Sequence, residues 1–130
     1  MDIVVKNLGL TDYEKTWGEM KDFIDSNPEE DELWITEHLP IFTTGVNKNK
    51  SVIPKTNITH LFVDRGGKIT YHGPGQLIIY TLINIKKNNI TIRQLVSLLE
   101  NSIIDFLEKN KINSYSKIDA PGVYTDEKKI

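Results

Sequence analysis

Residues 65–76 read Arg65-Gly66-Gly67-Lys68-Ile69-Thr70-Tyr71-His72-Gly73-Pro74-Gly75-Gln76, and this stretch sets the interpretation of the segments around it. It holds four of the eight glycines of a 130-residue chain. Glycine adds no side-chain packing and costs backbone entropy in the folded state, so such a density indicates sharp turns or a close approach of the backbone to a ligand. We therefore interpret the segment as a binding loop.

The segments on either side of this loop are apolar and typical of strands. Residues 58–63 precede it, and residues 77–83 follow it with a run apolar enough for a strand buried on both faces. Further strands are predicted at residues 3–8, 33–35 and 41–44. A hairpin is predicted at the C-terminal end. Its first strand is residues 123–125, its turn is the polar Asp126-Glu127, and its second strand, residues 128–130, has barely begun.

Two helices are predicted between the strands. Thr11-Asp12 offers an N-cap for a helix whose apolar positions recur at helical spacing, and this helix should end at Asn27-Pro28. Thr91 and Gln94 form a capping box for a second helix that runs to about Asn110. The apolar positions of the two helices are Tyr13, Trp17, Met20 and Ile24, and Leu95, Leu99, Ile103, Phe106 and Leu107.

The order of these elements predicts the fold class α+β, with helices that cover one face of a mixed sheet. No linker or repeat separates parts of the chain, so we expect a single domain over residues 1–130. Because the last hairpin stops within its second strand, we expect this domain to be incomplete, truncated at its C-terminus.

The composition excludes several classes of protein. The sequence has no cysteine and three scattered histidines, so disulfides, thiolate metal sites and thiol nucleophiles are excluded, and no metal site is expected. The first residues lack a signal peptide and no apolar run is long enough for a membrane span, so we expect a cytoplasmic protein with no membrane partner.

Charge is unevenly distributed along the chain. Residues 1–40 hold eleven acidic and three basic residues, whereas residues 41–130 hold seven and thirteen. A basic segment could attract an anionic partner, although it lacks the aromatic residues and motifs of nucleic-acid binding. Alternatively, its lysines are ordinary solvated side chains. The segment consists of Lys48, Lys50, Lys55, Arg65 and Lys68.

The chemistry of the glycine-rich segment argues against phosphate binding. Neither the P-loop spacing nor the dinucleotide-binding spacing is present, and a strand rather than a helix follows. The amides of Gly66 and Gly67, together with Arg65, Thr70 and His72, could line a slot for an acyl chain that ends in a carbonyl. On these residues alone, two tight turns and a histidine that satisfies a backbone group remain an alternative.

Three stretches resemble motifs of the octanoyltransferases of lipoate biosynthesis, also called lipoyl(octanoyl) transferases. The first is the segment 65–76 itself. The second is residues 34–45, which resemble an earlier strand motif of the family, and the third is Asp119-Ala120-Pro121-Gly122-Val123-Tyr124 followed by Lys128-Lys129-Ile130. All three occur in the family's order and span most of the chain.

This resemblance implies the fold of the biotin and lipoate protein ligase catalytic domains. It also implies an enzyme, an acyltransferase that moves an octanoyl group from octanoyl-acyl carrier protein to a lysine of lipoyl domains in 2-oxoacid dehydrogenase and related complexes. No cofactor is implied, since the incoming thioester is already activated. The residues implied as the substrate-binding wall are Arg65, Gly66, Gly67, Lys68, Ile69, Thr70, Tyr71 and His72.

The family mechanism uses a cysteine nucleophile and a lysine, and the resemblance implies Lys129 as the catalytic lysine, with the adjacent Lys128 as its competitor. An ammonium group near a thiol favours the reactive thiolate. In the family the cysteine lies downstream of this lysine, and this chain has no cysteine. We therefore expect the chain alone to be inactive in the double-displacement reaction.

Two other functions stay open at this point. A lipoate or biotin protein ligase has the same fold but activates its acid with ATP, and residues 70–76 fit the transferase better. A non-catalytic module could instead hold an acyl chain or bind a lipoyl domain, which would agree with the missing thiol.

Overall fold

The computed structural model describes residues 3–47 and 52–130. The chain forms two compact units, Met1–Ile83 (unit 1) and Asn84–Ile130 (unit 2). Because a compact unit can be part of a larger domain, the single domain over residues 1–130 stays a prediction. Helices and mixed sheets together confirm the predicted α+β class.

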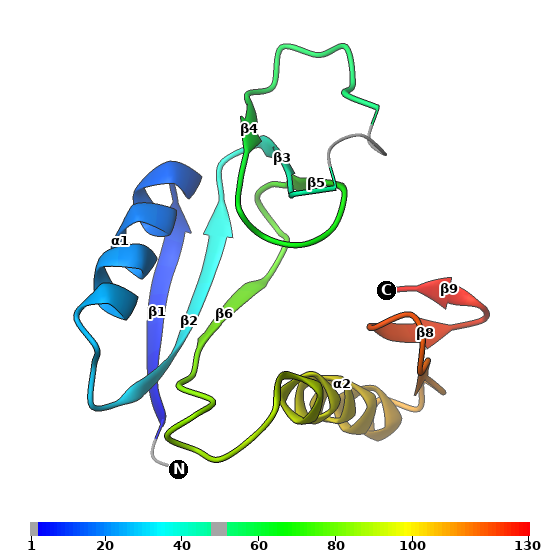
Figure 1. Cartoon of the computed structure of the whole chain (residues 1–130). Helices are drawn as coiled ribbons and strands as arrows, with labels where there is room; N and C mark the ends of the chain where they lie inside the picture. Colours follow the sequence, from blue (N-terminus) through cyan, green and yellow to red (C-terminus); the bar gives the residue numbers. More distant parts are fainter. Residues whose placement is uncertain (1–2, 48–51) are drawn as a thin grey trace. The chain divides into compact units, whose positions relative to one another are not determined.

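The first sheet of unit 1 has the strand order β1-β2-β6, with β1 at Ile3–Thr11, β2 at Asp31–His38 and β6 at Ile78–Leu82 (Figure 1). β1 and β2 are parallel, and β2 and β6 are antiparallel. A parallel pair needs a crossover, which the helix α1 at Tyr13–Asp25 supplies. The ring of Phe23 lies 5.8 Å from that of Trp34, so α1 packs on the face of β2 that carries Trp34.

The cap and the buried face of α1 agree largely with the sequence. The Asp12 side chain accepts a hydrogen bond from the amide of Lys15 at 2.9 Å, as predicted for the N-cap. Tyr13 and Met20 are buried. Ile24, which helical spacing placed on the same stripe, is instead exposed in the last turn of the helix.

The second sheet of unit 1 has the order β4-β3-β5, with β4 at His60–Phe62, β3 at Ile41–Thr44 and β5 at Ile69–His72. The glycine-rich segment is therefore not one continuous loop, because β5 pairs antiparallel with β3 in the middle of it. A small core of Tyr13, Ile41 and Val63 lies between the helix and this sheet.

The prediction that residues 77–83 form a strand buried on both faces is wrong for Ile79, which is 45% exposed. Ile79 pairs with Ile35, and successive residues of a strand point to opposite faces of the sheet. Its side chain therefore points away from the face on which Tyr80 and Trp34 pair and α1 packs.

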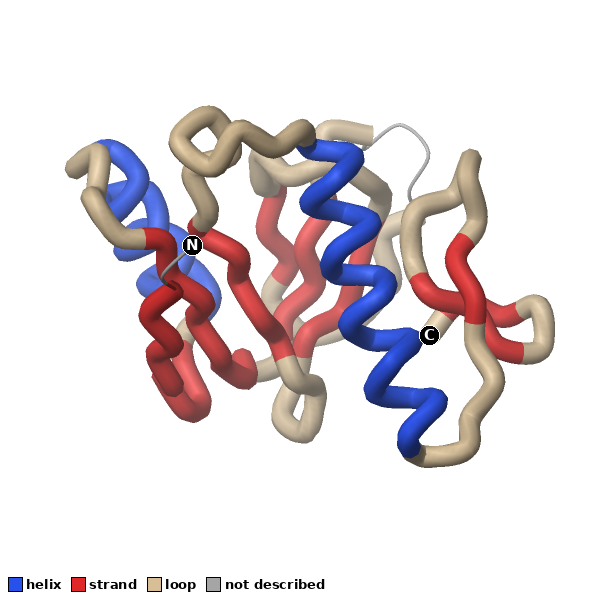
Figure 2. Tube along the Cα trace, turned by 90° about the horizontal axis from the view of Figure 1, so that it is seen from below, coloured by secondary structure: helices blue, strands red, loops and turns tan. Residues whose placement is uncertain are grey.

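The first helix or strand of unit 2 is α2 at Ile92–Lys109, the long helix in Figure 2. The predicted capping box of Thr91 and Gln94 is present. The apolar stripe of α2 is largely exposed; for example, Phe106 is 62% exposed.

A small antiparallel sheet with the order β7-β8-β9 completes unit 2. It contains the predicted C-terminal hairpin, formed by β8 at Val123–Thr125 and β9 at Lys128–Lys129. Asp126 and Glu127 both have positive φ, at 46° and 62°, as a two-residue hairpin turn of type I′ requires. The sequence did not predict β7, which spans Tyr115–Ser116.

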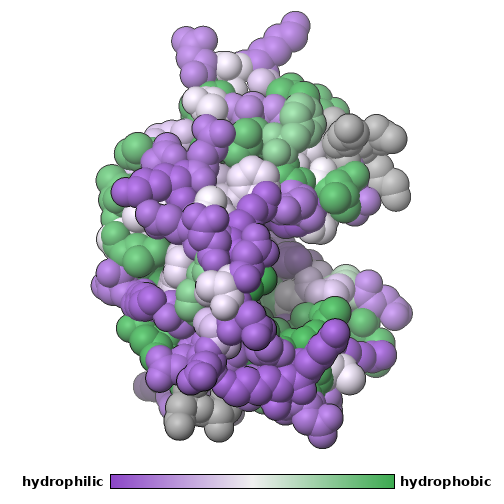
Figure 3. Space-filling model, turned by 60° about the vertical axis from the view of Figure 1, so that its left-hand side comes forward, coloured by the Kyte–Doolittle hydropathy of each residue, from purple (hydrophilic) through white to green (hydrophobic). Residues whose placement is uncertain are grey.

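The face of the molecule in Figure 3 carries hydrophilic side chains interspersed with hydrophobic ones. Within residues 3–47 and 52–130, neither helix combines the length and the apolar character that crossing a membrane would need.

Candidate functional site

Arg65 ties the glycine-rich segment to β3. Its Nη2 donates hydrogen bonds to the carbonyl and hydroxyl oxygens of Thr43 at 2.9 and 2.8 Å and to the hydroxyl of Thr70 at 3.0 Å. Its Nε also donates to the Thr43 hydroxyl, at 3.3 Å. A guanidinium suits this task because it presents five N–H donors in a planar fork. Arg65 thus links β3, the glycine pair and β5 in one fixed arrangement.

Gly45, directly after β3, lets this loop lie close to the backbone of the strand. A Cβ atom at Gly45 would lie 2.5, 2.7 and 2.8 Å from the carbonyl oxygens of Arg65, Gly66 and Gly67. The amide of Val46 donates to the Arg65 carbonyl at 3.0 Å, which fixes the same contact. Gly45 is the last residue of the stretch 34–45, and a glycine in a strand segment is a signal for close backbone approach.

The glycine pair leaves two backbone amides without an acceptor among the described residues. Gly66 and Gly67 are exposed, and Gly67 has a φ of +88°, which L side chains rarely adopt. No described residue accepts a hydrogen bond from either amide. Two adjacent donors on a loop held by Arg65 could bind a carbonyl oxygen or an anion.

His72, at the end of β5, is held in one tautomer. Its Nδ1 lies 2.9 Å from the Gln76 side-chain oxygen and therefore donates its proton there, and its Nε2 lies 3.3 Å from the Thr43 hydroxyl. Its ring stacks on that of Tyr13, with 5.7 Å between centroids. Burial lowers the pKa of His72 despite the bond to Gln76, and Arg65 lowers it further. The neutral imidazole is favoured in the fold.

The Gly73-Pro74-Gly75 turn that follows is fixed from β2. The amide of Gln76 donates to the Gly73 carbonyl at 3.1 Å, and Gly75 has a φ of +85°. The amide of Gly75 donates to the carboxylate of Glu37 at 2.7 Å. The end of the motif is thus a hydrogen-bonded turn with a carboxylate anchor.

A second polar group lies beside His72, and the sequence analysis missed it. His38 is fully buried, its Nδ1 lies 3.2 Å from the Thr11 carbonyl, and its Nε2 lies 2.7 Å from the Tyr80 hydroxyl. Its ring centroid lies 5.0 Å from that of Tyr13. Burial lowers the pKa of His38 and raises the pKa of both Tyr13 and Tyr80. All three groups are therefore favoured in their neutral forms.

A signal for His38 was present in the sequence. Trp34, Thr36 and His38 follow one another at the period of two that places strand residues on one face. All three are buried on β2. This alternation predicts that the His38 side chain lies on the buried face of the strand.

The predicted substrate-binding residues on β5 point alternately to the two faces of the strand. Thr70 and His72 lie on one face of β5 around Thr43, whereas Ile69 and Tyr71 alternate with them. Tyr71 is exposed and its ring lies 5.3 Å from that of Phe42. Lys68 is exposed. Lys48 and Lys50 of the basic segment lie outside the described residues.

Lys129 lies in unit 2, on β9. Its Nζ donates a hydrogen bond to the Pro121 carbonyl at 2.7 Å, and its chain passes over Gly122. Lys128 is exposed on the same strand. The catalytic function of Lys129 stays a prediction, as does the substrate-binding function of residues 65–72.

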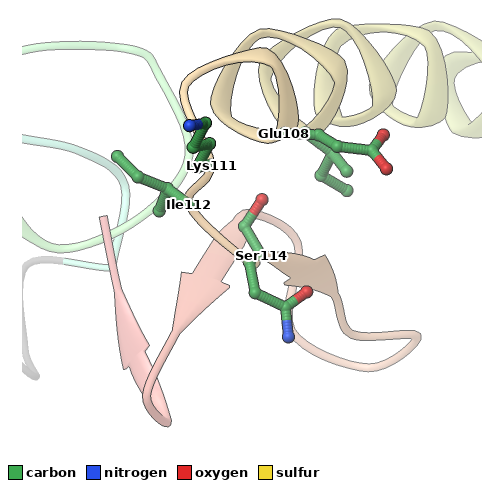
Figure 4. A pocket seen from close by; sticks show the side chains of 6 residues that line it. Glu108, Lys111, Ile112 and Ser114 are labelled. Carbon is green, nitrogen blue, oxygen red and sulfur yellow. The ribbon is translucent and has the colours of Figure 1, made fainter.

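Unit 2 also contains a cavity of about 330 Å³ at the C-terminal end of α2 (Figure 4). None of the predicted site residues lines it. Its lining residues are Ile104, Glu108, Lys111, Ile112, Asn113 and Ser114. Within the described part of the chain, no three histidine or carboxylate side chains gather in a group that could hold a metal ion.

Residues 13–130 match the family model of the lipoyl protein ligase A/B catalytic domain. An octanoyltransferase of Shewanella oneidensis is 50% identical over 129 residues, which cover 97% of this chain and 59% of that relative. Octanoyltransferases of Shewanella frigidimarina and Shewanella baltica are 50% and 49% identical over the same length. The chain thus spans about 60% of the length of these curated relatives.

Proposed function

This chain belongs to the family of lipoyl protein ligase A/B catalytic domains, and on that premise we propose that it serves octanoyl transfer in protein lipoylation. The observation that carries the proposal is the 50% identity to an octanoyltransferase over 97% of the chain. The proposed donor is octanoyl-acyl carrier protein, and the proposed acceptor is a lysine of a lipoyl domain. The proposed setting is the cytoplasm.

The geometry around the glycine pair supports an acyl-binding function. The exposed amides of Gly66 and Gly67 could donate hydrogen bonds to the carbonyl oxygen of an octanoyl thioester, and Ile69 and Tyr71 offer apolar surface on the adjacent strand. Arg65 holds this loop to β3 before any ligand arrives. Binding to a preorganised loop avoids the entropy cost of ordering it.

The proposed catalytic residue is Lys129, whose ammonium group would favour a thiolate nucleophile nearby. This sequence contains no cysteine. We therefore propose that this chain by itself binds the acyl group but forms no acyl-cysteine intermediate. Detectable octanoyl transfer by the pure chain would contradict that statement.

Electrostatic attraction supports the proposed partners. Residues 41–130 carry thirteen basic and seven acidic residues, and acidic carrier proteins and lipoyl domains would be steered toward them. Lys68, beside the glycine pair, is exposed and available for such steering. We expect the association rate to fall steeply with added salt, as stopped-flow measurements would show. A rate independent of salt would remove steering from the proposal.

The experiment that tests acyl binding is a titration of the ¹⁵N-labelled chain with the octanoyl thioester of N-acetylcysteamine, followed by NMR. We expect the amide signals of Gly66 and Gly67 to shift. The acetyl thioester is the matched control and should bind far more weakly, because each buried methylene contributes about 0.8 kcal/mol. Equal shifts with both thioesters, or shifts confined to other residues, would contradict the proposed wall.

A parallel assay separates the alternative functions. The chain is incubated with a lipoyl domain and either octanoyl-acyl carrier protein or octanoate with ATP and magnesium. Attachment that depends on ATP would indicate a ligase instead. Binding of the thioester without turnover in either reaction is the result expected from our proposal for this chain alone.

A further inference from the structure

The side chain of Lys129 folds back over the segment that precedes β8. Its Nζ donates to the Pro121 carbonyl at 2.7 Å. A Cβ atom at Gly122 would overlap the Cε of Lys129 and would lie 2.9 Å from its Nζ. The end of the lysine side chain therefore occupies the space that any side chain at Gly122 would need.

The backbone at Gly122 independently requires glycine. Its φ is +137°, in the region that L side chains rarely adopt. This conformation places the Pro121 carbonyl and the bare Cα of Gly122 together under Lys129. Both the space taken up by the Lys129 side chain and the local backbone conformation therefore require glycine at position 122.

Glu100, on α2, holds this backbone from the other side. Its Oε1 accepts a hydrogen bond from the amide of Gly122 at 2.6 Å. A carboxylate acceptor makes such a bond stronger than a neutral one. Glu100 is half-buried, so solvent competes less for the bond than on an open surface. Two hydrogen bonds therefore meet at the peptide group between Pro121 and Gly122. The Glu100 carboxylate accepts from its amide, and the Lys129 ammonium donates to its carbonyl.

We propose that Glu100 and Gly122 are positioning residues for Lys129, in that they hold the backbone on which its ammonium group rests. This inference rests on the proposed catalytic function of Lys129. Glu100 acts through the backbone and does not itself contact the ammonium. Loss of the acceptor oxygen at position 100 should release Lys129 from Pro121 while the hairpin remains.

The test is competitive acetylation of the full chain with N-hydroxysuccinimide acetate. Fragment-ion mass spectrometry gives the extent of modification at Lys129 and at its exposed neighbour Lys128, which is the internal reference. A hydrogen-bonded ammonium reacts more slowly, so the Lys129 to Lys128 ratio should be below one in the unaltered chain. We expect Glu100→Ala to raise this ratio about fivefold, as the loss of one typical hydrogen bond would.

Two variants serve as controls. In Glu100→Gln the amide oxygen can still accept the bond from Gly122, so the ratio should stay near that of the unaltered chain. Asp105→Ala removes an exposed carboxylate of the same helix and should also leave the ratio unchanged. An unchanged ratio in Glu100→Ala, with the thermal melting curve retained, would overturn the proposal.

A second measurement covers the case in which Glu100→Ala fails to fold. In the unaltered chain we expect nuclear Overhauser contacts between the Hα protons of Gly122 and the Hε protons of Lys129. Their absence overturns the proposal whatever the variants do. Neither measurement uses an acyl substrate, so a failure of positioning and a failure of octanoyl transfer are separate results.

Discussion

The hydroxyl of Tyr80 donates a 2.7 Å hydrogen bond to Nε2 of His38, and this contact joins β6 to the last residue of β2. The other ring nitrogen of His38 donates to the Thr11 carbonyl at 3.2 Å. Both nitrogens of a fully buried imidazole are therefore satisfied in its neutral form. This group lies directly beside His72 of the proposed acyl wall, with 6.2 Å between the ring centroids.

Tyr80→Phe should destabilise the fold by about 1–3 kcal/mol, because it leaves Nε2 of His38 buried without a donor. Urea unfolding monitored by circular dichroism measures the change in the free energy of unfolding. Tyr71→Phe is the matched control, since Tyr71 is exposed on β5, and should change it by less than about 0.5 kcal/mol. Equal effects of the two substitutions would contradict the assigned bond.

The stability of the chain should fall as the pH drops below 6.5. Burial lowers the pKa of His38 and of His72 from 6.5, so the unfolded chain binds more protons in this range. Their contribution is present above 6.5 and is lost as the pH falls through the folded pKa values, by up to about 1.4 kcal/mol per proton and pH unit. Glu32 and Glu127 also have lowered pKa values, but their loss begins only below 4.5.

Urea unfolding at about pH 7.5 and about pH 5.5 therefore isolates the histidine contribution. NMR titration of the ring Cε1 protons assigns it to His38 and His72. A midpoint at or above 6.5 for either ring would show that burial does not govern its titration.

Gly45→Ala should destabilise unit 1 by about 1–3 kcal/mol, because its Cβ would meet the carbonyl oxygens of Arg65, Gly66 and Gly67. Gly18→Ala provides the opposite control. Gly18 lies within α1 with open space around it, so alanine should stabilise the chain by about 0.5–1 kcal/mol through helix propensity. Thermal melting of both variants checks the prediction, and a neutral Gly45→Ala would show that the loop does not lie on β3.

Arg65→Lys should weaken binding of the octanoyl thioester and destabilise the chain by about 1–3 kcal/mol, since a lysine cannot replace the fork that bonds Thr43 and Thr70. The chain has one other arginine, Arg93, which is exposed on α2. Arg93→Lys should leave both quantities nearly unchanged. Isothermal titration calorimetry measures the affinity, and urea unfolding measures the free energy of unfolding. Equal effects of the two substitutions would show that Arg65 does not hold the proposed substrate-binding wall in place.

Local patterns predicted the elements that short-range chemistry specifies. The N-cap at Asp12, the capping box of Thr91 and Gln94, and the hairpin turn at Asp126-Glu127 all occur as predicted. The strand β5 inside the glycine-rich segment was missed. Its pairing partner β3 lies more than twenty residues earlier, and no local pattern contains such a pairing.

The sequence by itself determined the α+β class, the positions of both helices and the resemblance that the family match confirms. These follow from periodicity, capping and motif order, which neighbouring residues encode. Only the tertiary structure decided that Arg65 donates hydrogen bonds to Thr43 and that Gly45 lies under the glycine-rich loop. It also decided that His38, which is hydrogen-bonded to Tyr80, lies beside His72. Those contacts join residues far apart in the chain, and their geometry depends on the register of strands that pair only once the chain has folded.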